Sequence, residues 1–538
     1  MLGAEAVLRT LRAMGVERIF ASPGSDWAPL WEALARPHAS GEFPDYVSVR
    51  HEEAAVAMAS GWSKATGKLP AVMLHTTVGT LHAAMTLRIA LHERVPMVVM
   101  AGESIAFGEP PAPMVGRQWL RLLTDTGGPA RLIEASVKWS CTVNAASLLP
   151  PSVQRACQLA LNAPRGPVFL CVPIEHLMDE VPQPALASLP RPAAAEPAAL
   201  DALAKCLARA QRPLIITEEA GRDPAAVAAL VALAEALGAP VAEAWQPYYF
   251  NFPRAHPLYA GVVPDMAALM KDADAVLLAD AVLPWHPPSS LGQGMPVYAI
   301  GEDPLRARLP YWGFRTDMVV PGELRGTLRG LVERIPGKKP STRAARRLDP
   351  AAEAMSNAWI AQALDEALPA QAVVVNETIT HRLELLQRLT RLQPGGFFES
   401  SFGGLGVGLA TGLGVKHADP RRVVAVTIGD GAFHYNPVPA AFGASQELGL
   451  PLLVVLFDNA GYLSQRTDVQ TYYPDGAAVR SGRFAGTGIT PRPEYAKLAQ
   501  AYGGYGEKVE RPQDVPAALK RGLEQQQGRL ALIHMVLS

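Results

Sequence analysis

Two polar positions in the last third of the chain could together hold a divalent cation. Asp430, flanked by two glycines, directly follows the apolar run 423–428, and Asn459 lies just beyond the next such run, 452–457. If both runs are neighbouring parallel strands, their ends bring Asp430 and Asn459 to one edge of the sheet. With the carbonyl of Gly461 they offer about half of an octahedral Mg²⁺ shell, which phosphate oxygens and water would complete.

The glycines beside Asp430 suit an anion next to that cation. Gly429 and Gly431 carry no side chain, so backbone amides at these positions can approach a bound anion closely. The alternative interpretation is an ordinary turn at the end of a strand, because Gly-Asp-Gly is common in loops.

A second candidate centre lies near the N-terminus. Glu52 follows the apolar run 46–49 and stands at the start of a helical pattern that ends at Thr66. A partly buried carboxyl group has a raised pKa, so it can hold and share a proton. For Glu53 we favour the simpler explanation that acidic residues are preferred at helix N-termini.

The elements that must position these residues follow from the pattern of apolar runs. Two segments rich in Pro and Ala, 181–199 and 335–349, are predicted linkers, which gives predicted domains at 1–180, 195–335 and 350–538. Each block alternates short apolar runs with helical patterns, and we find no internal sequence repeat. The predicted helices are 53–66, 224–237 and 437–448, and the predicted strands are 18–21, 46–49, 71–74, 97–101, 213–217, 275–278, 372–375, 423–428, 452–457 and 530–536.

Continuous apolar strands separated by helices predict an α/β protein with three doubly wound parallel-sheet domains. In such sheets ligands bind beyond the carboxyl ends of the strands, which is where Glu52, Asp430 and Asn459 stand.

Composition limits the classes of function. The chain has 538 residues, 49% of them hydrophobic, which is too long for one core and sufficient for a large buried fraction. A formal net charge of −1 gives no electrostatic case for nucleic acid or an anionic membrane. No apolar run reaches the roughly 18 residues that a membrane span requires. The basic segment 334–347 is interpreted as a solvated linker, with a binding patch as the alternative.

Cysteine usage and the N-terminus predict a cytoplasmic protein. The N-terminus begins with an amphipathic helical pattern rather than a secretory signal. No C-x-x-C pair suggests a zinc site or a disulfide framework, so we expect reduced thiols at Cys141, Cys157, Cys171 and Cys206.

The spacing of the motifs resembles that of thiamine-diphosphate-dependent enzymes of the pyruvate-oxidase-like superfamily. Segment 429–459 is similar to their signature of Gly-Asp-Gly followed, about 24 to 27 residues later, by two Asn, although the first Asn is Asp458 here. His51, Glu52 and the segment 61–68 resemble the family's segment around its activating glutamate. The order of blocks resembles a pyrimidine-binding, a middle and a diphosphate-binding domain.

The resemblance implies thiamine diphosphate and Mg²⁺ as cofactors and assigns their contacts. Glu52 would help the cofactor lose its reactive ring proton, and Asp430, Asn459 and Gly461 would hold the metal. Leu405, in the segment 401–406, would bend the cofactor, with plain core packing as the alternative. The other implied cofactor contacts are Pro23, Gly24, Ile379, Thr380, His381, Gly429, Gly431, Ala432 and Tyr462.

Within the superfamily the chain resembles the benzoylformate decarboxylases. Ser25 stands in Ser-Pro-Gly-Ser where they have Asn-Pro-Gly-Ser, and would hydrogen-bond the substrate carboxylate. His75 matches an active-site histidine that can relay a proton, and His286 matches a second one, with a structural loop histidine as the alternative. His82 and His92 are interpreted as structural.

The function implied is decarboxylation of a small 2-oxo acid, with acyloin-forming carboligase activity. An acetolactate-synthase-like carboligase is the alternative, and a non-catalytic cofactor-binding or regulatory relative is the alternative of another class. Segment 216–221 lacks the glycine cluster expected near a flavin, which disfavours FAD. Trp27, Tyr462, Ser464 and Gln465 would line the substrate pocket without defining the substrate. The resemblance also implies a homodimer with shared active sites, assembled into a homotetramer.

Overall fold

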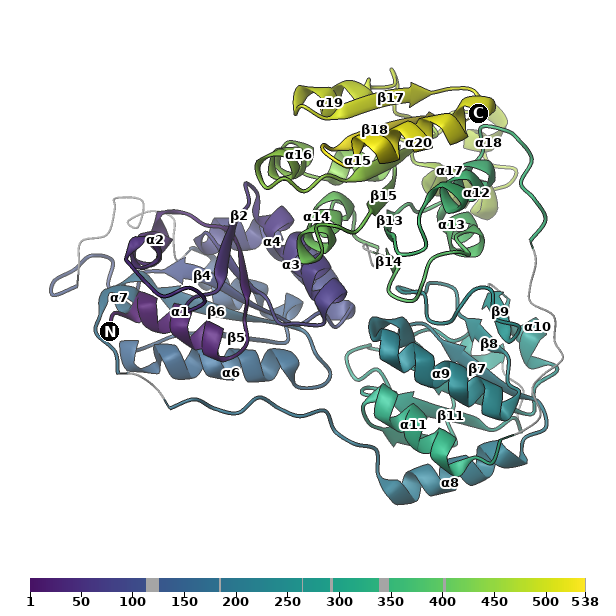
Figure 1. Cartoon of the computed structure of the whole chain (residues 1–538), viewed down its shortest axis with the longest axis horizontal. Coiled ribbons are helices and arrows are strands. Elements are labelled where there is room, and N and C mark those ends of the chain that lie inside the picture. The colour runs from purple at the N-terminus through teal and green to yellow at the C-terminus, as the bar shows by residue number, and fades with distance from the viewer. Residues whose placement is uncertain are drawn as a thin grey trace.

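The structure is a computed structural model that describes residues 1–112, 125–182, 185–263, 265–290, 294–337, 348–399 and 403–537. These residues build three α/β units, each around a parallel sheet of six strands with helices on its faces (Figure 1). The predicted class, three doubly wound parallel-sheet domains, is confirmed. The boundaries 1–180, 195–335 and 350–538 stay a prediction.

The first sheet has the strand order β2-β1-β3-β4-β6-β5. Residues of β3 alternate between two cores: Val72 and Leu74 pack with α3 and α4, while Ala71 and Met73 pack with α1 and α6. Both faces are therefore covered, which explains why the strand is apolar throughout. The strands are β1 Arg18–Ser22, β2 Asp45–Ser48, β3 Ala71–Leu74, β4 Met97–Glu103, β5 Trp139–Thr142 and β6 Pro167–Pro173; the helices are α1 Gly3–Ala13, α2 Ala28–Ala35, α3 Glu52–Thr66, α4 Thr76–His92, α5 Pro129–Ile133, α6 Leu149–Leu161 and α7 Ile174–Met178.

The second sheet has the order β12-β11-β10-β7-β8-β9. Its helix α9 shows how local sequence sets the bounds: Asp223 caps its N-terminus by accepting from the amide of Ala225, and Gly238 ends it in a left-handed conformation with φ of 61°. The strands are β7 Pro213–Thr217, β8 Val241–Glu243, β9 Tyr259–Val262, β10 Ala275–Ala279, β11 Val297–Gly301 and β12 Met318–Pro321; the helices are α8 Pro197–Arg209, α9 Pro224–Leu237, α10 Met266–Met270 and α11 Leu324–Arg334.

The third sheet, β14-β13-β15-β16-β18-β17, repeats the strand order of the first. The residues after β15 begin a short helix at Asp430, which the sequence analysis did not predict. The strands are β13 Val373–Glu377, β14 Phe397–Glu399, β15 Val424–Gly429, β16 Leu453–Asp458, β17 Tyr505–Val509 and β18 Ala531–Val536; the helices are α12 Asn357–Ala367, α13 Arg382–Arg388, α14 Gly408–Ala418, α15 Asp430–Tyr435, α16 Val438–Glu447, α17 Leu463–Tyr472, α18 Ala477–Ser481, α19 Tyr495–Ala501 and α20 Val515–Gln525.

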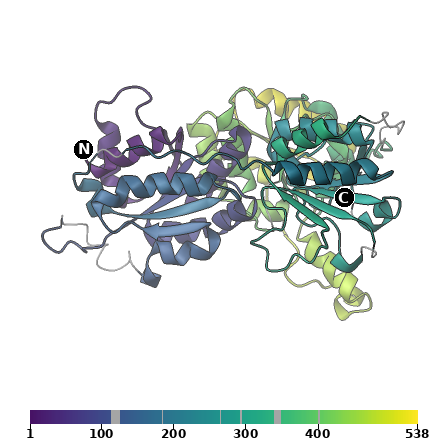
Figure 2. The same cartoon turned by 90° about the horizontal axis from the view of Figure 1, so that it is seen from below.

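The first and third units meet through α3 and α14, which lie side by side (Figure 1). Two glycines allow this close approach: a Cβ at Gly61 would lie 2.1 Å from the carbonyl oxygen of Thr411, and one at Gly414 would lie 2.0 Å from that of Met58. The second unit lies against the third, with the first unit to one side of both (Figure 2). No described helix has the length and hydropathy needed to cross a bilayer.

Candidate active site

The carboxyl ends of β1 and β3 hold the first group of candidate residues. The two strands are paired in parallel, with Ser22 opposite Leu74, so the segments that follow them emerge side by side. Gly24 lies directly against the ring of His75, where a Cβ would stand 2.1 Å from Nδ1. Only glycine leaves room for the imidazole at this place.

A buried carboxylate orients His75. Its Nδ1 lies 2.7 Å from Oδ1 of Asp26, whose side chain is fully buried, and the other oxygen of Asp26 accepts from the amide of Gly102 at 3.1 Å. The hydrogen bond to Asp26 raises the pKa of His75. This arrangement leaves the second ring nitrogen free to face a ligand and strengthens the proton affinity of the imidazole.

Glu52 lies beside His75 because α4 comes close to the start of α3. A Cβ at Gly79 would stand 3.1 Å from the Glu52 side chain and 3.3 Å from Cβ of His75, so the missing side chain is what lets the three positions meet. Glu52 is half-buried. Pro23 and Ser25 flank Gly24, and Ser25 is exposed at the rim. The structure therefore brings Pro23, Gly24, Ser25, Glu52 and His75 into one region of the first unit, which we call the N-terminal cluster.

The carboxyl ends of β15 and β16 hold the second group. Asp430 accepts from the amides of Gly431 and Gly461, each at 2.9 Å, and Oδ1 of Asn459 accepts from the same Gly461 amide at 3.1 Å. Because two oxygens share one donor, Asp430 and Asn459 face one small volume. Gly431 leaves room for the ring of Tyr462, which a Cβ would approach to 2.8 Å. We call these residues, with Gly429 and Ala432, the C-terminal cluster.

The charge of this cluster fits a bound cation. Asp430 is 1% exposed, and burial raises its pKa to about 7. Among the described residues it forms no ion pair. A buried carboxylate, an amide oxygen and a carbonyl in one volume are the oxygen donors that Mg²⁺ prefers. Nothing lies within 4 Å of a Cβ at Gly429, so the space in front of the cluster is open. The residues present therefore suit Mg²⁺ with a diphosphate.

Asp458, the departure from the family signature, has its own partners. One carboxylate oxygen lies 2.7 Å from Nε2 of the buried His534, and the other accepts from the amide of Ala460 at 2.8 Å. Ala460 adopts a left-handed φ of 58°, a conformation that costs energy for a residue with a side chain. Asp458 therefore supports the backbone turn that carries Asn459, and its carboxylate also lies beside that of Asp430, whose pKa it helps to raise.

The loop after β13 contributes exposed and buried residues. Ile379 and Thr380 are exposed and available to a ligand, whereas His381 is 5% exposed and stacks on Phe457 with ring centroids 5.3 Å apart. Burial lowers the pKa of His381 to about 4, so its ring is neutral near pH 7. Before the loop, the carboxylate of Glu377 accepts from the amides of Gly406, Val407 and Gly408 and from the side chain of Asn436.

Glu377 anchors the segment that carries Leu405. Leu405 is partly buried and packs against the large core shared by the first and third units. Core packing and a cofactor contact are both compatible with this position. Ser401 and Phe402, the first residues of that predicted segment, lie outside the described residues.

Other candidate residues do not join either cluster. His286 is exposed in the second unit, and no described contact links it to Ser25, Glu52 or His75. Trp27 is fully buried in the core of the first unit, where its indole donates to the carbonyl of Leu74 at 2.8 Å. In the described chain it therefore lines no open pocket.

Sequence reasoning missed the partners that orient the candidate residues. Asp26, Glu377 and His534 act on residues that are distant in the chain, and a single acidic residue or histidine carries no spacing signal.

No hydrogen bond or ion pair between described residues links the N-terminal cluster to the C-terminal cluster. The surfaces around them are apolar: Val78, Leu81 and Met85 on α4 are 42%, 51% and 44% exposed, and Tyr435 beside the C-terminal cluster is 56% exposed. Exposed apolar patches of this kind are typical of interaction sites.

Comparisons with known proteins agree along the whole chain. Three family models of thiamine pyrophosphate enzymes match: the N-terminal TPP binding domain at residues 1–118, the central domain at 200–292 and the C-terminal TPP binding domain at 378–535. Benzoylformate decarboxylase of Pseudomonas aeruginosa is 29% identical over 475 residues, covering 84% of this chain and 85% of that protein. Acetolactate synthase isozyme 2 large subunit of Escherichia coli is 25% identical over 540 residues, covering 96% and 93%.

The fold is also found among solved structures. Benzoylformate decarboxylase from Polynucleobacter necessarius superposes with a TM-score of 0.85 at 21% identity, covering 100% of this chain and 98% of that one.

Proposed function

Because the chain belongs to the thiamine pyrophosphate enzymes, we propose that it is a 2-oxo acid decarboxylase of the benzoylformate-decarboxylase type that uses thiamine diphosphate and Mg²⁺ and also forms acyloins. The 29% identity to benzoylformate decarboxylase supports the reaction type. The use of Mg²⁺, the absence of FAD and the individual residue roles are parts of this proposal.

The observation that carries the proposal is the pairing of His75 with Asp26 beside Glu52. Two groups that can exchange a proton stand together at the carboxyl end of one sheet, the edge at which ligands bind. A site that only held a cofactor would need no oriented histidine with a raised pKa.

Each residue then has a task that its surroundings support. When bound, thiamine diphosphate supplies the electron sink that lets a 2-oxo acid lose carbon dioxide. Asp430, Asn459 and the Gly461 carbonyl hold Mg²⁺ against the diphosphate. Glu52, half-buried beside His75, would help the bound cofactor lose its reactive ring proton, and Ser25 at the rim would donate a hydrogen bond to the substrate carboxylate.

His75 is suited to deliver the proton that replaces the lost carboxyl group. Asp26 holds one of its ring nitrogens, so the other can carry the proton toward the substrate. Its raised pKa keeps the imidazolium populated closer to neutral pH than for a free histidine.

The test is carbon dioxide release from pyruvate, branched-chain 2-oxo acids, phenylpyruvate and benzoylformate, with thiamine diphosphate and Mg²⁺ present. We expect release with at least one acid, lost in Glu52→Gln and retained in Glu53→Gln. Glu53 is a matched control: it is the neighbouring acid on the same helix, but its side chain faces Gly406 of the third unit. Equal loss in both variants would contradict the role of Glu52.

Acetolactate synthesis is the second candidate, because the acetolactate synthase relative covers 96% of this chain. Product analysis separates the two: aldehyde from the active acid supports the decarboxylase, and acetolactate from pyruvate supports the synthase. Cofactor binding with no product from any acid would instead favour a non-catalytic relative.

We further propose that the active site forms between two chains, the N-terminal cluster of one facing the C-terminal cluster of the other. The apolar patch on α4 and the lack of a hydrogen bond or ion pair between the described residues of the two clusters support this arrangement. Assembly of two such dimers into a tetramer stays a prediction.

Mixing inactive variants tests the shared site. In a dimer of one Glu52→Gln chain and one Asp430→Asn chain, one site would carry both defects and the other neither. Random mixing should therefore restore about a quarter of wild-type activity, since half of the dimers are mixed and each has one intact site. Sites formed within single chains would give no recovery, and each variant alone is the control.

A further inference from the structure

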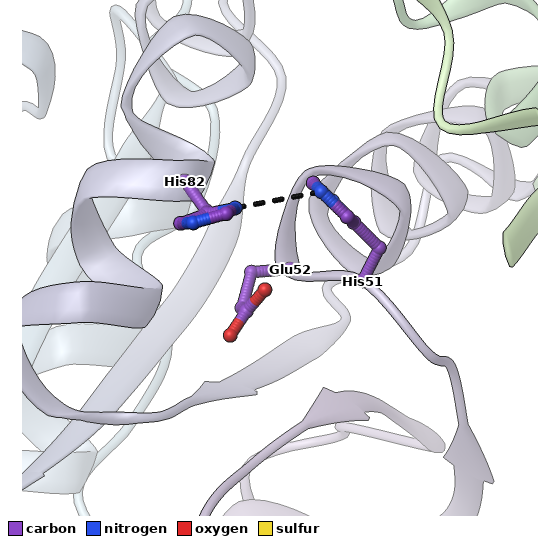
Figure 3. Close-up of side chains that lie close together, drawn as sticks. All are labelled: His51, Glu52 and His82. Carbon is purple, nitrogen blue, oxygen red and sulfur yellow. Dashed lines mark hydrogen bonds between the residues drawn. The ribbon is translucent and has the colours of Figure 1, made fainter.

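A trio of potential metal ligands lies beside the N-terminal cluster. His51 and Glu52 stand at the start of α3, and His82 lies across from them on α4, as Figure 3 shows. One ligand atom from each side chain lies within 4.8 Å of the other two. No other group of three such side chains occurs in the part of the chain that the structure describes.

The two imidazoles already have the spacing of ligands on one metal ion. Nε2 of His51 and Nδ1 of His82 are 3.4 Å apart. With metal–nitrogen bonds of about 2.0–2.1 Å and a tetrahedral angle, two nitrogens on Zn²⁺ are about 3.3–3.4 Å apart. A carboxylate oxygen of Glu52 lies within 4.8 Å of both histidine ligand atoms, so a movement of at most about 1.5 Å of this half-buried side chain brings it to the same distance.

Metal binding would cost one local hydrogen bond. Nδ1 of His51 accepts from the amide of Glu53 at 3.2 Å, so in the neutral ring the proton is on Nε2 and is directed at His82. A metal at Nε2 moves that proton to Nδ1 and ends this helix-capping bond. His82 is exposed, and metal binding at its ring would break no such helix-capping hydrogen bond.

We propose that His51, Glu52 and His82 bind a divalent transition metal of the Zn²⁺ class, and that this metal and thiamine diphosphate exclude one another by competing for Glu52. Two imidazoles and one carboxylate, with water as the fourth ligand, suit Zn²⁺ or Co²⁺, whereas Mg²⁺ prefers oxygen ligands. The competition between the metal and thiamine diphosphate rests on the proposed function, whereas metal binding by the three side chains does not. The site would make the enzyme sensitive to Zn²⁺ at saturating Mg²⁺.

The test is titration of the full chain with Zn²⁺ by calorimetry and with Co²⁺ by visible absorption, in excess Mg²⁺ so that the C-terminal cluster is occupied. We expect one Zn²⁺ per chain, tetrahedral Co²⁺ bands, and affinity at least tenfold weaker in His82→Gln. His92→Gln is the matched control, because His92 lies on the same helix, outside the trio. Equal affinity in wild type and His82→Gln would overturn the site.

The same variants test the competition. Adding thiamine diphosphate should weaken apparent Zn²⁺ affinity at least tenfold, and Zn²⁺ should inhibit carbon dioxide release from wild type but much less from His82→Gln, whose activity without Zn²⁺ is unchanged. If Zn²⁺ binding depends on His82 but ignores thiamine diphosphate, the shared use of Glu52 is overturned. If no acid is turned over, the proposed function fails while the titrations still decide the metal site.

Discussion

The carboxyl edges of the second and third sheets both carry buried acids, but the chain balances their charges differently. Glu219, just after β7, binds the guanidinium groups of Arg94 and Arg306, the latter at 2.7 Å, and Arg222 lies 3.1 Å away. Burial opposes its ionisation, yet these arginines lower the pKa of Glu219. Asp430, after β15, is equally buried, but it accepts from backbone amides and its neighbouring side chain is a second carboxylate, Asp458, so no cation among the described residues balances its charge.

The difference teaches that burial alone does not identify a functional carboxylate. The charge of Glu219 is balanced by side chains from the first and second units, so it holds a junction together. No described cation balances the charge of Asp430. A bound metal cation would therefore stabilise the C-terminal cluster. The following variants separate a structural from a functional acid, ordered from the largest expected effect to the smallest.

Asp430→Asn should abolish function without unfolding the chain. Its amide oxygen still accepts from Gly461, but the metal loses its charged ligand. We expect turnover to fall by a thousandfold or more, equivalent to at least about 4 kcal/mol, with an unchanged unfolding midpoint. The measurements are carbon dioxide release and calorimetric titration with thiamine diphosphate and Mg²⁺.

Asp280→Asn is the control for Asp430→Asn. Asp280 is a buried acid just after β10 in the second sheet, with a left-handed φ of 51° that Asn tolerates. Activity per folded chain should persist. If Asp430→Asn bound the cofactor as tightly as the wild type does, Asp430 would not be the functional acid of the comparison.

Glu219→Gln should have the opposite effect. Arg94, Arg306 and Arg222 would keep their buried charges with less compensation, so the free energy of unfolding should fall by about 3–5 kcal/mol. Urea unfolding measures the loss, and activity of the folded fraction should stay within about twofold of wild type. Should this variant fail to fold, the milder Arg222→Met, at a side chain 21% exposed, should give a smaller loss in the same direction.

Glu218→Gln should change how stability depends on pH. Burial raises the pKa of Glu218 to about 7 despite amides of Val282 and Leu283 that donate to it. Between pH 4.5 and about 7 the unfolded chain loses a proton that the folded chain keeps, so stability falls as pH rises through this window. The wild type should lose free energy of unfolding on the order of 3 kcal/mol over this pH window, and Glu218→Gln should not.

Urea unfolding at pH 5 and pH 8 checks this. The wild type should lose stability over the interval relative to Glu218→Gln, whose amide oxygen still accepts from both backbone amides. Parallel pH curves for the two proteins would show that Glu218 is ionised in the folded chain throughout.

Asp458→Asn should have the smallest effect. The Asn oxygen can still accept from Ala460, but the charged bond to His534 is lost, so we expect a stability loss of about 1–2 kcal/mol. Mg²⁺ affinity should change less than tenfold, because the hydrogen bonds of Asp458 to His534 and Ala460 make it a support of the turn and not a metal ligand. A double-mutant cycle with His534→Gln measures the coupling, and additive losses would exclude a direct pair.

Local sequence predicted the strands that position the candidate site, but not all of the helices around it. The strands 71–74 and 213–217 and the helix 224–237 are found with the predicted bounds, because apolar runs, caps and Gly stops act locally. Several short strands were not predicted, among them β8 and β14, each of three residues, since so few residues show no periodicity. The short helix beginning at Asp430 was not predicted, because its two glycines favour a turn as much as a helix.

The sequence also did not predict that the first and third sheets have the same strand order. No internal repeat was visible, yet both sheets run 2-1-3-4-6-5 in their own numbering. Many different apolar sequences fill the same layers, so topology can repeat without residues repeating.

The sequence by itself determined the fold class, the family resemblance and the positions of Glu52, Asp430 and Asn459, because short motifs at strand ends are encoded by neighbouring residues. Tertiary structure alone decided which partner each charge has. Asp26 meets His75 across 49 residues, Asp458 meets His534 across 76, and Arg94 meets Glu219 across 125. Such partners stand on separate elements, and only packing of the whole chain determines whether a buried acid is neutralised or left for a ligand.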